Sequence, residues 1–159
     1  MRYYIAYGSN LNKGQMRTRC PNARAVGTAE IKDYRLLFKG SRSGAYLTIE
    51  KEKGHSVPVG IWEVDERDER NLDRYEGFPV FYYKENMRLL VKDKDGNTEE
   101  KDCFVYIMHE DRKLGLPSDY YVAVCTLGYE DFGFDTAPLL EAYEYTASHM
   151  RKNKHDRED

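Results

Sequence analysis

Tyr7-Gly8-Ser9-Asn10-Leu11, near the N-terminus, is the stretch that decides the fold. It follows a short strand-like run at residues 3–6 and precedes polar sequence typical of a helix that stops at Pro21. Glycine permits backbone turns closed to residues with a Cβ, and the first N–H groups of a helix lack partners within it. The segment therefore predicts either an ordinary capped strand-to-helix turn or a cradle of main-chain N–H groups for an anionic or oxyanionic group.

A second informative stretch covers residues 57–77. Its first part alternates between apolar and polar residues like a strand, and Asp65 is then a good N-cap for a highly charged helix. That helix should end at Gly77, with Pro79 just beyond it. Glu76 is therefore expected to be the last helical residue.

Together these two stretches resemble the gamma-glutamylcyclotransferase family, including its AIG2-like and BtrG-like relatives. The hallmarks are the YGSNL loop and a lone glutamate before a glycine, in a helix that follows a glycine-containing strand. The resemblance continues through residues 117–121, Pro-Ser-Asp-Tyr-Tyr, and residues 128–133, and it spans roughly residues 1–147. One departure is that Gly133-Phe134-Asp135 replaces the usual Gly-Leu-Pro, in a segment expected to frame the pocket.

The resemblance implies an α+β fold, a small, largely closed mixed β-barrel with flanking helices and a pocket at one end. It also implies an enzyme that cyclises a γ-glutamyl amine or γ-glutamyl amino acid. The α-amino group attacks the γ-carbonyl and releases 5-oxoproline and an amine, without cofactor or metal. Such a reaction needs a folded substrate, donors for the oxyanion and one proton carrier.

Glu76 is the candidate proton carrier. A carboxylate at a helix C-terminus faces the negative end of the helix dipole, which raises its pKa, and burial among Phe78, Phe81 and Tyr83 would act in the same direction. Without the resemblance, the preferred interpretation of Glu76 is one more surface carboxylate of an acidic helix. The resemblance further implies that the substrate contacts Tyr4, Ile5, Ala6, Tyr7, Gly8, Ser9, Asn10, Leu11 and Tyr121. Tyr83 is expected to form a pocket wall, and Tyr106 is a weaker candidate.

Composition limits the class of protein. The chain has 159 residues, enough for one core, and we expect one domain over residues 1–150 with a charged tail at 151–159. The formal charge of -3 gives no basic surface for nucleic acid, and no apolar run is long enough to cross a membrane. Three widely spaced cysteines and the absence of a signal-peptide pattern favour a cytoplasmic protein with reduced thiols. The oligomeric state is not indicated.

Tyrosine is unusually frequent, with 14 residues against 6 phenylalanines. Its apolar ring and polar tip suit the wall of a pocket for a small polar ligand, although we expect most of these residues to be half-exposed strand positions.

The remaining pattern indicates more strands than helices. Strands are expected at 25–38, 45–50, 86–91 and 103–108, a turn at 51–56, a hairpin turn at Asp95-Gly96, and helices at 118–126 and 136–150. Two other chemistries are weaker alternatives: a metal site at His109-Glu110-Asp111, against an ordinary loop, and a thiol nucleophile at Cys125, against a buried cysteine. A second function also stays open, a non-catalytic small-ligand binding or adaptor domain of the same fold.

Overall fold

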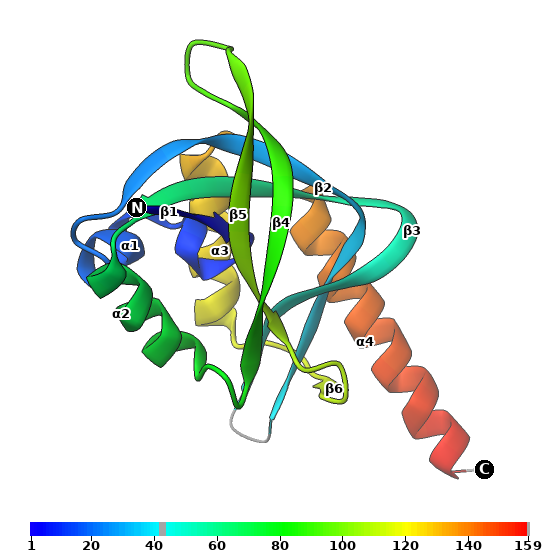
Figure 1. Ribbon diagram of the computed structural model, residues 1–159. Helices are drawn as coiled ribbons and strands as arrows, with labels where there is room; N and C mark the ends of the chain where they lie inside the picture. Colours follow the sequence, from blue (N-terminus) through cyan, green and yellow to red (C-terminus); the bar gives the residue numbers. More distant parts are fainter. Residues whose placement is uncertain (42–43, 159) are drawn as a thin grey trace.

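The computed structural model describes residues 1–41 and 44–158. Five of its strands close into a mixed barrel, whose arrangement can be followed in Figure 1. The strands run in the order β3-β1-β5-β4-β2, and β2 pairs again with β3 to complete the ring. β1 is parallel to β5, and the other pairs of the ring are antiparallel. The expected fold class is therefore confirmed. The strands are β1 (Arg2–Ala6), β2 (Arg24–Ser41), β3 (Gly44–Val64), β4 (Tyr82–Lys92), β5 (Thr98–Met108) and a short β6 (Lys113–Leu114) on β2.

The two longest strands, β2 and β3, form one continuous ribbon, and the turn expected at residues 51–56 is not a chain reversal. The pairing register between β2 and β3 shifts at this point: Lys32 pairs with Ser56, but Tyr34, two residues on, pairs with Lys51. At the shift Asp33 adopts a positive φ of 61° and its Oδ1 accepts a hydrogen bond from the Gly54 N–H at 3.0 Å. The glycine and polar residues that suggested a turn thus form a bulge, since both features use the same residue types.

Four α-helices and one 3-10 helix flank the barrel. Side chains of Asn12, Asp65 and Ser118 cap three of the α-helices by accepting a main-chain N–H. In Figure 1, α4 lies against β2 and extends away from the barrel, and α3 covers the 3-10 helix. The helices are η1 (Ser9–Leu11), α1 (Lys13–Arg19), α2 (Glu66–Glu76), α3 (Asp119–Asp131) and α4 (Ala137–Glu158).

Helix α4 is longer than the sequence predicted. It continues through residues 151–158, which were expected to be a charged tail, while Asp159 lies outside the described residues. Within residues 1–41 and 44–158, no helix combines the length and apolar character needed to span a bilayer.

Candidate active site

A cavity of about 340 Å³ lies where β1 ends and β4 begins. The turn after β1 forms one part of its wall and the last turn of α2 forms another. Seven of the 14 tyrosines face it, so the tyrosine-rich composition reflects this pocket more than we expected. The lining residues are Tyr4, Ile5, Tyr7, Gly8, Ser9, Asn10, Tyr46, Leu47, Arg74, Tyr75, Glu76, Gly77, Phe81, Tyr82, Tyr106 and Tyr121.

The turn after β1 lines this cavity and leaves two main-chain donors without a protein acceptor among the described residues. Carbonyls of Gly8 and Ser9 accept the N–H groups of Leu11 and Asn12 at 3.0 Å and so close η1. The N–H groups of Ser9 and Asn10 have no protein acceptor among the hydrogen bonds of the described residues. The turn also lies close to Tyr121, because a Cβ on Gly8 would be 3.3 Å from its hydroxyl oxygen. These two N–H groups are therefore available to a ligand oxygen.

Glu76 enters the cavity from the end of α2. A capping box between Asp65 and Asp68 starts this helix, and Gly77 ends it in the left-handed conformation with φ 65°. Glu76 keeps some accessible surface because it opens on the cavity, yet protein atoms surround it. This burial raises the pKa of its carboxyl from 4.5 to about 8, and the charge of Arg19 acts in the opposite direction. The direction of the shift agrees with the expectation from sequence.

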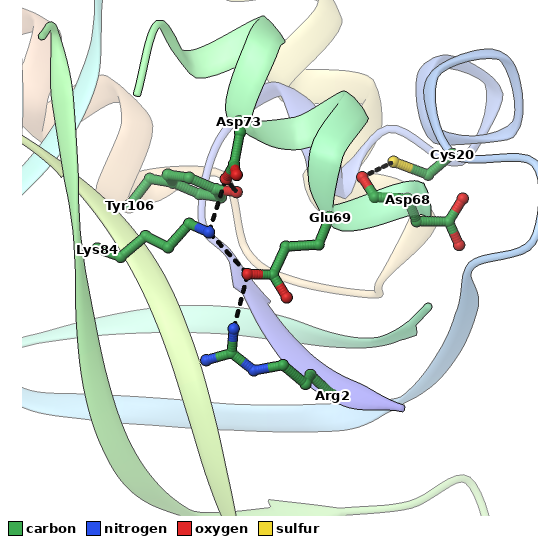
Figure 2. Close-up of polar contacts among 7 residues, drawn as sticks. All are labelled: Arg2, Cys20, Asp68, Glu69, Asp73, Lys84 and Tyr106. Atoms are coloured by element: carbon green, nitrogen blue, oxygen red, sulfur yellow. Dashed lines mark hydrogen bonds and ion pairs between the residues drawn. The ribbon is translucent and has the colours of Figure 1, made fainter. Parts of the chain in front are cut away.

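A network of charged side chains holds α2 against the barrel on the same face (Figure 2). Lys84 Nζ on β4 lies 2.6 Å from Glu69 Oε2 and 2.7 Å from Asp73 Oδ1. The Tyr106 hydroxyl donates to Asp73 Oδ1 at 2.6 Å. Glu69, Asp73 and Glu76 follow one another at i, i+4 and i+7, so they share one side of the helix. The network therefore fixes the side of α2 from which Glu76 projects.

Some of the tyrosine hydroxyls around the cavity already donate their proton within the protein, and others can still donate it to a ligand. Tyr7 donates to the Tyr106 carbonyl at 2.6 Å and Tyr82 to the Leu47 carbonyl at 2.9 Å. The Tyr121 oxygen instead accepts the Leu47 N–H at 3.1 Å. Because that contact uses only its oxygen, the Tyr121 hydroxyl keeps a proton that it can donate to a ligand.

Eight residues expected to form the site line this one cavity: Tyr4, Ile5, Tyr7, Gly8, Ser9, Asn10, Glu76 and Tyr121. Three other expected residues lie outside the cavity lining: Ala6, Leu11 and Tyr83. Leu11 is fully buried beneath α3, where Gly128 approaches it. Tyr83 lies on the other side of β4, where its hydroxyl bonds Glu110 and its ring contacts His109.

Tyr82 occupies the wall position that was predicted for Tyr83. Successive side chains of a strand point to opposite faces, so an error of one residue places the wrong tyrosine in the pocket. Tyr106, the weaker candidate, does line the cavity. Phe81 and Gly77, which were expected only as neighbours of Glu76, line the cavity as well. No sequence pattern indicated the remaining lining residues: Tyr46, Leu47, Arg74 and Tyr75.

The segment at Gly133 does not frame the cavity. Phe134 instead packs against Tyr129 and Phe132, with ring centroids 5.8 Å apart in each pair. The unusual Gly133-Phe134-Asp135 sequence thus belongs to an aromatic cluster outside the cavity lining.

The two alternative chemistries gain no support from the site. All three cysteines are free and buried, and burial raises the pKa of Cys125 to about 12, which disfavours a thiolate. His109 Nε2 lies 2.8 Å from the Pro79 carbonyl oxygen. Within the part of the chain that the structure describes, no three His, Cys, Asp or Glu side chains gather as they would around a metal ion.

Comparison with known proteins identifies the family. The sequence model of the family described as "Gamma-glutamyl cyclotransferase, AIG2-like" matches residues 4–123, more than half of the chain. The chain belongs to the AIG2-like gamma-glutamyl cyclotransferase family. The matched range contains both the Gly8–Asn10 turn and Glu76.

Individual members of this family are similar over most of the chain. The Homo sapiens protein named gamma-glutamylcyclotransferase is 27% identical over 157 residues, covering 90% of this chain and 80% of the relative. The Mus musculus protein named gamma-glutamylaminecyclotransferase is 28% identical over 116 residues, covering 67% and 77%. A solved gamma-glutamyl cyclotransferase superposes with a TM-score of 0.74 at 25% identity, covering 92% of this chain and 86% of that one.

Proposed function

We propose that this protein catalyses the intramolecular cyclisation of a γ-glutamyl amine or γ-glutamyl amino acid to 5-oxoproline. The observation that carries the proposal is the position of Glu76, a single carboxyl with a raised pKa in the same cavity as the Gly8–Asn10 turn. A proton carrier and a set of oxyanion donors are the two groups that this chemistry needs most.

In the proposed reaction the substrate's α-nitrogen attacks its γ-carbonyl carbon. A new C–N bond closes the five-membered ring, and the carbonyl oxygen becomes an oxyanion that the free N–H groups of Ser9 and Asn10 stabilise. Glu76 takes the proton from the attacking nitrogen and delivers it to the leaving nitrogen as the old C–N bond breaks. Atoms balance without water, because the proton lost by one nitrogen is gained by the other.

The cavity has the size of a small-molecule site, since its volume of about 340 Å³ is at the lower end of the usual range. A γ-glutamyl unit that binds there in a folded conformation would have its amine and carbonyl close together. The two relatives differ in name, one a cyclotransferase and the other an aminecyclotransferase, so both substrate classes are candidates.

The proposal is tested by screening γ-glutamyl amino acids and γ-glutamyl amines for release of 5-oxoproline. The purified wild type should release it from at least one compound, and Glu76→Gln should not. If no compound in either class yields 5-oxoproline, the catalytic proposal fails.

The alternative, a binding domain without turnover, is distinguished by the same samples. It predicts that a γ-glutamyl compound or 5-oxoproline binds to wild type with no product formed. The raised pKa of Glu76 favours the enzyme, because a site that only binds ligand has no use for a carboxyl that exchanges its proton near neutral pH.

A further inference from the structure

Arg19, at the end of α1, lies behind the cavity and does not line it. Its Nη1 donates to the side-chain oxygen of Asn10, and its Nη2 donates to Gln15 Oε1 at 3.0 Å. Its guanidinium also stacks on Tyr75, with Cζ 3.4 Å from the ring centroid. Arg19 therefore contacts two residues of the cavity wall from outside.

These contacts fix the direction of a chain of hydrogen bonds. A guanidinium can only donate, so Arg19 forces the oxygen of the Asn10 amide to face it and the nitrogen to face the other way. The Asn10 nitrogen then donates to the Tyr4 hydroxyl oxygen at 2.9 Å. The Tyr4 hydroxyl oxygen accepts this hydrogen bond, so the hydroxyl proton remains available for donation. Among the described residues, no acceptor for that proton is found.

We propose that Arg19 is a positioning residue that, through Asn10, makes the buried Tyr4 hydroxyl a hydrogen-bond donor to the substrate. The inference rests on the proposed function, and it adds a side-chain donor from β1 to the main-chain donors of the turn. Without Arg19 the Asn10 amide is free to rotate and present its oxygen to Tyr4. The Tyr4 proton would then be used within the protein.

Arg19 also acts on Glu76 through its charge. It is the cation that opposes the effect of burial on the pKa of Glu76, so its removal should raise that pKa further above about 8. A second cation, Arg74, also lines the cavity. Burial, and in addition the charge of Glu76, raises the pKa of five tyrosine hydroxyls, which stay neutral over the working pH range: Tyr4, Tyr7, Tyr75, Tyr82 and Tyr106.

The test compares Arg19→Met, Arg19→Lys, Tyr4→Phe and the double variant Arg19→Met/Tyr4→Phe. Arg17→Met, an exposed position on the same helix, is the matched control. The variants are compared by the pH-independent value of kcat/KM for 5-oxoproline release. This value does not change when a substitution only shifts the pKa of Glu76. Thermal unfolding of each variant establishes that it is folded.

We expect Tyr4→Phe to lose about 10²-fold in kcat/KM, as for removal of one oxyanion donor. Arg19→Met should lose about tenfold, the worth of one hydrogen bond, and Arg19→Lys should recover most of it. The double variant should be no slower than Tyr4→Phe alone, because Arg19 acts through Tyr4. Arg19→Met, unlike Arg17→Met, should also shift the acid limb of the kcat/KM profile to higher pH.

The proposal is overturned if the double variant loses as much kcat/KM as the product of the two single losses. It is also overturned if Arg19→Lys is as impaired as Arg19→Met. If the wild type shows no turnover, the proposed function fails, and the same variants are then compared by their affinity for 5-oxoproline in calorimetry. The same non-additive pattern in affinity would keep Arg19 as a positioning residue. Additive losses, or no binding by the wild type, would reject it.

Discussion

Ser9 Oγ lies 3.0 Å from the hydroxyl of Tyr75, which joins the turn after β1 to the residue immediately before Glu76. The two residues are 66 positions apart in the chain. The donors of the turn and the carboxyl of Glu76 are therefore held together by direct contact as well as by the barrel. Both groups can reach one small substrate without a large motion of either element.

Replacement of the proposed proton carrier should abolish turnover. Glu76→Gln keeps the shape of the side chain but cannot carry a proton, so kcat should fall on the order of 10²–10⁴-fold. The measurement is steady-state release of 5-oxoproline from the best substrate found in the screen. Glu144→Gln, an exposed glutamate on α4, is the matched control and should retain wild-type activity. Near wild-type activity of Glu76→Gln would remove Glu76 from the mechanism.

The pH dependence should reflect the raised pKa of Glu76. The carboxyl must be ionised in the free enzyme to take a proton, so kcat/KM should rise with pH through an acid limb centred near the pKa of about 8. The profile should fall again where other groups on the enzyme or the substrate lose their protons. An acid limb centred below pH 5 would mean that Glu76 is ordinarily solvated in the free protein.

The same burial should lower the free energy of unfolding when Glu76 is ionised. Its pKa is near 4.5 in the unfolded chain and about 8 in the folded protein, so between these values the folded state binds the extra proton and stability falls as pH rises. Glu76→Gln should therefore stabilise the protein at pH 8, by roughly 2–4 kcal/mol at most, and the gain should disappear near pH 4.5. Denaturant unfolding of the two proteins at both pH values measures this, with Glu144→Gln expected to change neither.

Two adjacent tyrosines on β4 provide a matched pair of variants. Tyr82 faces the cavity and its hydroxyl donates to the Leu47 carbonyl, whereas Tyr83 faces away toward His109. Tyr82→Phe should raise KM several-fold and cost about 1 kcal/mol of stability through the lost hydrogen bond. Tyr83→Phe should leave kinetics unchanged. The opposite ranking in steady-state kinetics would mean that substrate binds on the outer side of β4.

Activity should not depend on an added metal ion, because the proposed steps are proton transfer and oxyanion stabilisation. Dialysis against a chelator should leave the rate of 5-oxoproline release unchanged. A loss that zinc or manganese restores would contradict this mechanism and direct attention to His109 and its neighbours.

The sequence predicted those parts of the fold that local residue types determine. Asp65 and Gly77 marked the ends of α2 correctly because N-caps and left-handed C-caps have strong residue preferences. The bulge at Asp33 was missed, since its partner segment contains the same glycine and charged residues as a turn. The extent of α4 was underestimated because a charged, polar sequence gives no apolar period from which to read a helix.

The site was predictable where a motif lies next to the cavity and unpredictable where the cavity wall comes from tertiary packing. Glu76 and the Gly8–Asn10 turn belong to short motifs, whereas Tyr46 reaches the cavity only through packing against Phe81 and Tyr121. Arg19 had no distinguishing neighbour in the sequence. Arg19 is the last residue of α1, and it contacts Asn10 in the preceding helix η1 only because α1 folds back beside that helix.

The β4–β5 hairpin projects beyond the barrel (Figure 1), and its tip provides an attachment point for single-molecule or surface-based experiments. β4 starts beside the cavity at Tyr82 and runs for 11 residues, so the far end of the strand is about 35 Å from Tyr82 at the usual rise per residue. Two hydrogen bonds stabilise the turn at the tip, since Asp93 Oδ1 accepts the N–H groups of Asp95 and Asn97 at 2.9 and 3.0 Å. A cysteine introduced at exposed Lys94 can carry a dye or a surface tether while the cavity stays open to solution.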